Sequence, residues 1–327
     1  MSVVDQLLAR LEADRVVTDA DVMDQYRHDR ALTATAGKPL AVVRARSIDD
    51  VVATLEIASA TKTPVVTRGA GTGLAGGANA VDGCIVLSTA LMNRILSIDV
   101  AQRSATVEPG VLNGDLAAAV AEHGLWYAPD PSSRAICSIG GNVATNAGGA
   151  CCVKYGVTGD HVAALKAVLA DGSIIETGSV CRKNVAGLDL TKLLVGSEGT
   201  LAVVVEVTVR LRPAPKPPAT LVAVFPTAET AGEAVLAIDK VAEFSLVEMM
   251  DRTTIRAVEA HLRMGLDTDA GALLIVQSDS ASAGDDVARA EAACTAAGAT
   301  FTAATTDAEE GAAFLHARHS SIPALEA

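Results

Sequence analysis

Glycines and one arginine are concentrated between residues 68 and 77, which read RGAGTGLAGG. Ordering so many glycines costs backbone entropy, so the run needs a physical explanation. One explanation is a tight bend between strands. The other is functional: successive unshielded N–H groups form a concave nest that wraps a diphosphate. Arg68 would then add positive charge, or it would form an ordinary salt bridge.

Residues 71–76 of this run also match the G-x-G-x-x-G pattern of dinucleotide-binding folds, and Asp99 follows at the distance expected for a ribose ligand. That fingerprint must open a helix. Here the next residues are GANAVDG, which cannot sustain a helix. The context therefore argues against a nicotinamide dinucleotide site.

Two more glycine-rich runs follow in the chain. Residues 138–150 read SIGGNVATNAGGA and are preceded by PDPSS at 129–133, while residues 196–200 read GSEGT. In this order and spacing, the three runs resemble the flavin-binding domain of the vanillyl-alcohol-oxidase (PCMH) type. The resemblance is closest to the D-lactate dehydrogenase and glycolate-oxidase catalytic-subunit branch of the FAD-linked oxidases. It covers roughly residues 39–213 and continues less closely to residue 327.

The resemblance implies FAD as the cofactor and assigns a role to each run. The first run would donate backbone N–H groups to the diphosphate, the second would let the backbone approach the flavin closely, and the third would hold the adenine side. Covalently flavinylated relatives carry a His near the first run, which this chain lacks, so non-covalent FAD is expected. The implied FAD-binding residues are Arg68, Gly69, Ala70, Gly71, Thr72, Gly73, Leu74, Pro129, Ser132, Ile139, Gly140, Gly141, Asn142, Thr145, Ala147, Gly148, Gly149, Tyr155, Gly156, Glu198, Gly199 and Val204.

Two segments near the C-terminus resemble the substrate end of the same branch. Residues 247–252 (VEMMDR) fit a segment that reads ELMDR in relatives, although a strand leading into a helix N-cap at Asp251 explains them equally well. Arg318, in FLHAR, resembles the arginine that pairs with the substrate carboxylate, and a guanidinium fork suits that geometry. A solvated surface charge is the alternative. Arg318 is the one candidate catalytic residue.

The implied reaction is oxidation of a small D-2-hydroxy acid, lactate- or glycolate-like, by hydride transfer to flavin N5. A cytochrome, quinone or flavoprotein would then accept the electrons. Relatives carry an HxGDGNxH-type metal motif beyond this point, and none of the six histidines here lies in one. We therefore expect no metal ligands in this chain and a truncated end, natural or not, with slow oxidation by the chain alone. The alternative is a non-catalytic FAD-binding subunit of a glycolate-oxidase-like complex. The possible protein partners are a companion subunit or further copies of this chain in an oligomer.

Bulk properties narrow the class of protein. The formal net charge of −13 and the lack of a Lys/Arg cluster argue against nucleic-acid partners and anionic membranes. No stretch reaches the roughly 18 apolar residues of a membrane span, and the N-terminus lacks signal-peptide features. A cytoplasmic protein with reduced cysteines is expected.

The periodicity predicts an α+β chain of two domains. Helices are expected at 3–11, 47–58 (with Asp50 as capping-box partner) and 113–123, strands at 63–67, 84–88, 94–99, 104–108 and 201–211, and a hairpin around Asp171-Gly172. Residues 126–155 read as irregular. The proline-rich segment 212–219 is expected to be an extended linker.

These elements suggest an N-terminal helical segment (1–36) and an FAD-binding domain (37–215) with a βαβ subdomain and an antiparallel subdomain. The rest (216–327) is expected to be a partial, ferredoxin-like α+β substrate cap, truncated at its C-terminal end. Its helices, at 228–241, 253–261 and 283–297, are expected on one face of a mostly antiparallel sheet.

Overall fold

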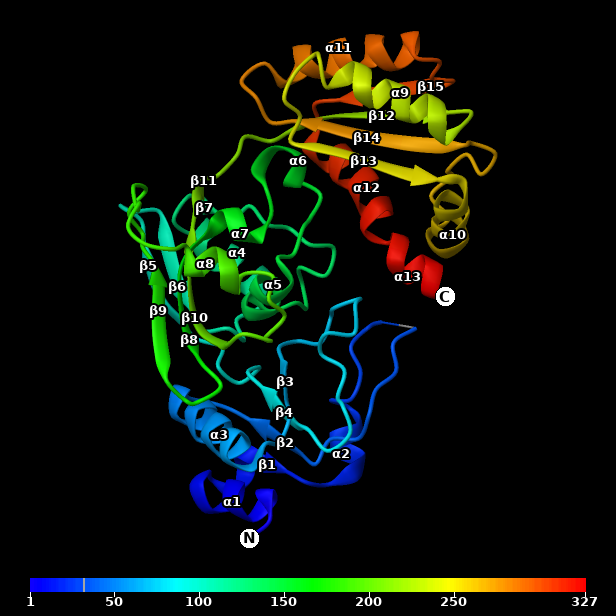
Figure 1. The fold of residues 1–327 in the computed structure, drawn as a ribbon. Coiled ribbons are helices and arrows are strands. Elements are labelled where there is room, and N and C mark those ends of the chain that lie inside the picture. The colour runs from blue at the N-terminus through cyan, green and yellow to red at the C-terminus, as the bar shows by residue number, and fades with distance from the viewer. Residues whose placement is uncertain (32) are drawn as a thin grey trace. The chain divides into compact units, whose positions relative to one another are not determined.

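The computed structural model describes residues 1–31 and 33–327, which form two compact units (Figure 1). The first unit contains Met1–Gly148 and Val157–Pro213, and the second contains Gly149–Gly156 and Ala214–Ala327. No helix in the described part of the chain is long and apolar enough to cross a bilayer.

The first unit begins with a small α/β layer. Its sheet has the order β1-β2-β4-β3, in which β2, β4 and β3 are parallel and β1 runs antiparallel to β2. These strands are β1 (Val16–Val17), β2 (Ala41–Arg44), β3 (Val65–Arg68) and β4 (Ile85–Ser88). Helix α3 (Ile48–Thr61) provides the crossover between β2 and β3, and α1 (Val3–Arg10) packs against it. The predicted βαβ arrangement is therefore present.

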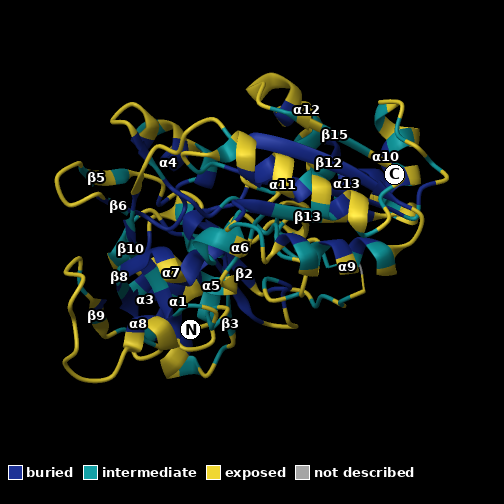
Figure 2. Ribbon diagram, turned by 90° about the horizontal axis from the view of Figure 1, so that it is seen from above, coloured by how far each residue is buried: buried dark blue, intermediate teal, exposed yellow. Residues whose placement is uncertain are grey.

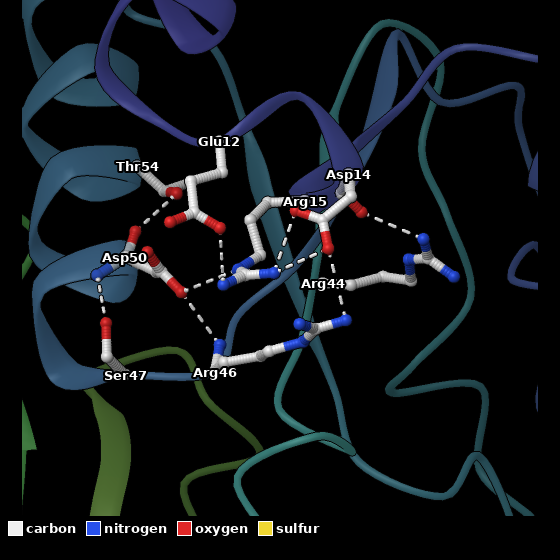
Figure 3. Close-up of polar contacts among 8 residues, drawn as sticks. All are labelled: Glu12, Asp14, Arg15, Arg44, Arg46, Ser47, Asp50 and Thr54. Atoms are coloured by element: carbon white, nitrogen blue, oxygen red, sulfur yellow. Dashed lines mark hydrogen bonds and ion pairs between the residues drawn. The ribbon is translucent and has the colours of Figure 1, made fainter.

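Helix α3 begins where the sequence predicts, because the Ser47 hydroxyl accepts the Asp50 N–H at 3.1 Å. The reciprocal half of the predicted capping box differs, since the Asp50 carboxylate accepts the N–H of Arg46. A polar network extends from there to the N-terminal segment (Figure 3). The Arg15 guanidinium lies 2.7 Å from Asp14 and 3.5 Å from Asp50. These contacts connect the segment before β1 to the start of α3. Helix α2 (Ala20–Asp24) follows β1 in the chain.

The second sheet of this unit is antiparallel, with the order β5-β6-β10-β8-β9. Its strands are β5 (Ile95–Asp99), β6 (Ser104–Val107), β8 (Val162–Val168), β9 (Ile174–Gly178) and β10 (Val203–Arg210). The β8–β9 hairpin turns at Gly172, with φ of +87°, as Asp171-Gly172 predicts. The first two residues of the proline-rich segment form β11 (Arg212–Pro213), paired with β7 (Leu125–Trp126), so that part is a short strand rather than a linker.

Three short helices and one longer helix of the first unit cover this sheet and its loops. They are α4 (Asn113–Ala121), α5 (Ile139–Thr145), α7 (Thr158–His161) and α8 (Leu190–Leu194). Helix α6 (Cys152–Tyr155) belongs to the second unit. Helix α4 ends before Gly124, whose φ is +66°, as expected. The prediction that residues 126–155 are irregular was wrong over α5 and α6. Packing explains α5, because Ile139 and Val143, one turn apart, are both fully buried.

The second unit is a four-stranded antiparallel sheet of order β13-β14-β12-β15. Its strands are β12 (Ala219–Phe225), β13 (Leu246–Asp251), β14 (Ala272–Ser278) and β15 (Phe301–Thr305). Helix α9 (Ala228–Ile238) joins β12 to β13, α10 (Arg252–Leu262) joins β13 to β14, and α11 (Ala283–Ala296) joins β14 to β15. The topology is ferredoxin-like, with α10 as an addition, as expected.

The helices of this unit cover both faces of its sheet. One apolar cluster includes residues of α9 and α11, and a second includes residues of α10, α12 (Ala308–His319) and α13 (Ser321–Glu326). The prediction of helices on one face was therefore wrong. The reason is that every residue of β12 and β14 is buried, as the dark strands of Figure 2 show, so both faces require cover.

Candidate cofactor-binding site

The first unit contains a cavity of about 410 Å³ where the predicted cofactor-binding runs come together. Segments around residues 69–78, 131–147 and 198 form its wall. The lining residues are Asp29, Thr67, Gly69, Ala70, Gly71, Thr72, Gly73, Leu74, Ala75, Gly77, Ala78, Pro131, Ser133, Ser138, Gly141, Asn142, Ala144, Thr145, Ala147 and Glu198. The tertiary fold thus brings parts of all three glycine-rich runs to one hollow.

The first run follows β3 directly and forms no helix. Within the described chain, none of the backbone N–H groups from Gly69 to Ala78 donates to an intramolecular acceptor. Gly71 and Gly76 have φ of +71° and +83°, a region that favours glycine. Unpaired amides along a cavity wall are available to donate to a bound ligand.

Arg68, the last residue of β3, is buried next to Gly71 and is not among the residues that line the cavity. It is 9% exposed, and its Nη1 atom is buried without a hydrogen-bond partner in the described chain. A Cβ atom added to Gly71 would lie 2.2 Å from Arg68 Nη2, so a larger residue there would have to displace the guanidinium. Burial lowers the pKa of Arg68, and the negative charge of Asp29 partly offsets that effect. A half-desolvated cation beside open amides favours an anionic ligand.

The second run is built differently, because it opens helix α5. Ser138 is the N-cap and its hydroxyl accepts from Gly141. Each of the first four backbone N–H groups of α5 donates to an acceptor within the chain. Ile139 N–H donates to Val111 O (2.8 Å) and Gly140 N–H to Pro109 O (2.7 Å). Gly141 N–H donates to Ser138 Oγ (3.3 Å) and Asn142 N–H to Ser138 O (2.9 Å). These backbone donors are therefore not free for a ligand.

The structure separates the predicted residues of this run into two groups. Gly141, Asn142, Thr145 and Ala147 line the cavity. Ile139 has no exposed surface and packs in the core, and a Cβ on Gly140 would lie 2.5 Å from the Pro109 Cβ atom. Glycine at 140 is thus required by packing against the chain rather than by an open cavity wall.

The PDPSS segment before α5 also differs from the expectation in detail. The structure places Pro131 and Ser133 on the cavity wall, and not Pro129 or Ser132. The Pro129 carbonyl instead accepts a hydrogen bond from Asn113 Nδ2 at 3.2 Å.

The third run contributes Glu198, which lines the cavity, and Gly199 beside it. Both have positive φ, +51° and +74°. A Cβ on Gly77 would lie 2.1 Å from Glu198 Oε2, so the first and third runs lie against each other. Gly199 and Val204 line a smaller hollow of about 50 Å³, whose wall shares Gly69 and Glu198 with the larger cavity.

Among the remaining predicted residues, Gly148 ends the first portion of the first unit, while Gly149, Tyr155 and Gly156 belong to the second. There the Tyr155 hydroxyl and the Lys154 ammonium group both contact the carboxylate of Asp279, the latter at 2.6 Å. This short segment is therefore anchored just after strand β14.

Arg318 lies on α12, and its guanidinium is paired within the second unit. Its Nε atom donates to Glu248 Oε2 on β13 at 2.6 Å, and the two side chains are 31% and 19% exposed. Glu248 belongs to the VEMMDR segment. The Asp251 carboxylate of the same segment accepts the Thr254 N–H at 2.8 Å and caps α10, which confirms the N-cap interpretation.

Sequence reasoning missed several residues of the cavity wall. Gly77 and Ala78 simply continue the first run, and Ser138 and Ala144 lie within the second, so their neighbours gave a signal. Asp29 gave none. It lies far from the runs in sequence, and its N–H donates to the Asn79 side chain at 2.7 Å.

Comparison with protein families identifies two domains. Residues 39–178 match the FAD binding domain, and residues 214–327 match the C-terminal domain of FAD linked oxidases.

Curated relatives match over most of the chain. Glycolate oxidase subunit GlcD of Bacillus subtilis is 40% identical over 317 residues, covering 96% of this chain and 65% of that protein. The GlcD subunit of Escherichia coli (strain K12) is 39% identical over 314 residues, 94% of this chain and 62% of that one. D-lactate dehydrogenase of Archaeoglobus fulgidus is 39% identical over 251 residues, 76% of this chain and 56% of that one. The chain thus spans somewhat less than two thirds of the length of these relatives.

Solved structures share the fold at lower identity. Alkyldihydroxyacetonephosphate synthase superposes with a TM-score of 0.79 at 18% identity, covering 99% of this chain and 63% of that one. p-Cresol methylhydroxylase superposes with a TM-score of 0.75 at 18% identity, covering 92% and 65%. The α+β architecture expected from the sequence is therefore confirmed.

Proposed function

This chain belongs to the FAD-linked oxidases of the vanillyl-alcohol-oxidase (PCMH) type, and on that premise we propose that it is a flavoprotein oxidoreductase acting on a small D-2-hydroxy acid, lactate- or glycolate-like. Curated relatives carry the names glycolate oxidase subunit, D-lactate dehydrogenase and D-2-hydroxyglutarate dehydrogenase. The chemistry common to these names is oxidation of a hydroxyl carbon next to a carboxylate.

One observation carries the cofactor part of the proposal. Unpaired amides of the first run line a single cavity, and the buried Arg68 guanidinium lies beside Gly71, a residue of the cavity wall. Neutral donors and one cation together fit a diphosphate, and positive-φ glycines leave room for its close approach. FAD supplies a hydride acceptor at flavin N5, which oxidation of the substrate carbon requires. The third run, with Glu198, Gly199 and Val204, is assigned to the adenine side.

FAD is proposed to bind without a covalent link. Side chains that form flavin links in relatives are histidines near the first run, and here that run reads Arg68, Gly69, Ala70, Gly71 and Thr72. Binding then depends on hydrogen bonds, charge and shape, so the cofactor is removable without breaking a bond.

Arg318 is the proposed anchor for the substrate carboxylate. Glu248 occupies its Nε donor, which holds the guanidinium in place and leaves the Nη groups for a second carboxylate. The electrons are proposed to pass to a cytochrome, quinone or flavoprotein acceptor, with a companion subunit as the relatives' names suggest.

The cofactor proposal is tested by the spectrum of the purified chain. We expect the two absorption bands of oxidised flavin, and release of all the colour as free FAD on acid precipitation. Colour that stays with the precipitate would contradict non-covalent attachment. A colourless protein that fails to take up added FAD would overturn the cofactor proposal itself.

The substrate proposal is tested by anaerobic flavin reduction with a panel of D- and L-hydroxy acids. Because charge-assisted hydrogen bonds contribute about 1.5–3 kcal/mol, Arg318→Ala should lower kcat/KM for a D-2-hydroxy acid by roughly 10- to 100-fold. Arg256→Ala, which removes an exposed arginine from α10, is the matched control and should have no effect. Equal rates for Arg318→Ala and the native chain would exclude the anchor. FAD bound but reduced by no acid would favour a non-catalytic FAD-binding subunit.

A further inference from the structure

A hydrogen-bonded pair of buried asparagines, Asn113 and Asn142, joins helix α4 to the second glycine-rich run. Asn113, the first residue of α4, has no exposed surface. Its Nδ2 atom donates to the Pro129 carbonyl at 3.2 Å and to Asn142 Oδ1 at 3.1 Å. The Cys137 thiol also donates to Asn142 Oδ1, at 3.6 Å. Three chain segments, 113, 129 and 137–142, are therefore joined at one point.

The polarity of this chain of hydrogen bonds is set at one end. A carbonyl such as that of Pro129 only accepts, so Asn113 must turn its amide nitrogen toward it. The second hydrogen on the same nitrogen then points at Asn142, so the Asn142 Oδ1 atom must face Asn113 and accept this hydrogen bond. Reversing Asn142 would place its NH2 group against the donors of Asn113 and Cys137. The orientation of the Asn142 amide thus follows from its hydrogen-bond partners.

The arrangement leaves one polar atom unsatisfied. Asn113 Oδ1 is buried and has no partner in the described chain. An unpaired buried acceptor is unfavourable, and a nonpolar side chain at 113 would avoid it. Retaining an asparagine under that penalty is explained if its two donated hydrogen bonds have a function.

Because its Oδ1 atom faces Asn113, the Asn142 side chain has its Nδ2 donor left for the cavity. It lines the cavity wall, its N–H and C=O are both used by the backbone around α5, and its Nδ2 atom has no acceptor in the described chain. We propose that the Asn142 side-chain NH2 group donates to the bound FAD, and that Asn113 is the positioning residue that aims it. This inference rests on the proposed function, and it assigns the second run a side-chain donor in place of backbone donors.

The direct test is FAD titration of the apoprotein, followed by flavin fluorescence quenching. Asn142→Asp preserves size and keeps an oxygen toward Asn113 and Cys137, but it turns the cavity-facing donor into an acceptor. FAD should bind at least tenfold more weakly. Asn184→Asp adds the same charge at an exposed site and should leave affinity unchanged. Unchanged affinity in Asn142→Asp, with the native chain binding FAD normally, would overturn the inference. Failure of the native chain to bind FAD would instead overturn the proposed function.

The positioning role is tested by a double-mutant cycle, because coupled residues show non-additive effects. Asn113→Asp presents acceptors to Asn142 and so should reverse the Asn142 amide without touching the cavity. We expect it to weaken FAD binding about tenfold alone and not at all in an Asn142→Ala background. An equal loss in both backgrounds would show that Asn113 acts through Pro129. If Asn113→Asp unfolds, Asn113→Ser, which retains one donor, replaces it in the cycle. A shifted flavin absorption maximum in Asn142→Asp would locate the contact on the isoalloxazine ring; an unshifted maximum with weaker binding would locate it elsewhere on FAD.

Discussion

The first and second glycine-rich runs look alike in sequence but use glycine in different ways. In the first, from Gly69 to Ala78, the backbone N–H groups are unpaired within the described chain. In the second, from Ile139 to Asn142, each N–H has an acceptor and the run is helical. The first run therefore has free backbone donors at the cavity wall, whereas the second has its backbone N–H groups occupied and contributes side chains such as that of Asn142 to the wall.

The contrast shows that glycine count alone does not identify a phosphate nest. Glycine at 71 is needed for a positive φ and for room beside Arg68. Glycine at 140, in contrast, is needed because Pro109 packs against it. One requirement concerns the ligand site and the other concerns folding, so substitutions should separate them.

The largest effect is expected for Gly71→Val. A β-branched residue is strained at φ of +71°, and its Cβ atom would collide with the Arg68 guanidinium. Strain of this kind costs about 1–3 kcal/mol, and with the collision FAD affinity should fall by at least about 100-fold. Flavin absorbance per protein measures the occupancy. Gly124→Val is the control, since Gly124 has φ of +66° but nothing within 4 Å of its Cβ position. Full occupancy in Gly71→Val would mean that the first run is only a bend between strands.

Arg68→Met should weaken FAD binding while sparing the apoprotein. A charge-assisted hydrogen bond to a phosphate contributes about 1.5–3 kcal/mol, so a roughly 10- to 100-fold loss of affinity is expected. The apoprotein should unfold at the same temperature or higher, because a buried cation that forms no salt bridge within the described chain is removed. Calorimetry of the native chain and of Arg68→Met gives the FAD affinity and the unfolding temperature of each apoprotein. Arg182→Met controls for the lost charge, and a less stable Arg68→Met apoprotein would identify Arg68 as structural.

Matched alanines at 140 and 141 should divide the second run into folding and binding positions. Gly140→Ala forces a methyl group against Pro109 and should destabilise the apoprotein by about 1–3 kcal/mol. Gly141→Ala meets only Ser138 Oγ, at 3.1 Å, so it should lower FAD affinity with little effect on stability. Gly141→Val should abolish FAD retention by filling more of the cavity, not through backbone φ, which is helical there. Urea unfolding and FAD titration of each variant test the division. Equal effects at both positions would contradict it.

The smallest effect concerns the hydroxyl groups of the two runs. Ser138→Ala removes the N-cap of α5 and should cost about 1 kcal/mol of stability. Thr72→Ala, in the first run, removes a hydroxyl that makes no hydrogen bond within the described chain, so apoprotein stability should not change. Thermal unfolding of the two apoproteins gives the comparison. A loss of stability in Thr72→Ala would show that the first run has internal order of its own.

Several features were predictable because their causes are local. Ser47 and Asp251 cap helices within three residues of themselves, and Asp171-Gly172 forms the β8–β9 turn. The alternation of apolar residues also gave most strands, and the order of the three glycine-rich runs led to the family. For each of these, the interacting groups are neighbours in the sequence.

What the sequence did not determine depends on partners that are distant in the chain. Helix α5 forms in a glycine-rich run because Val111 and Pro109 supply acceptors and Ile139 is buried in the core. Arg318 has a partner, Glu248, from a strand 70 residues away in sequence. The direction of the Asn142 amide likewise depends on Asn113. Sequence patterns therefore determined which residue types could bind FAD, whereas only the tertiary structure decided which backbone donors stay free, because that depends on whether another segment supplies an acceptor.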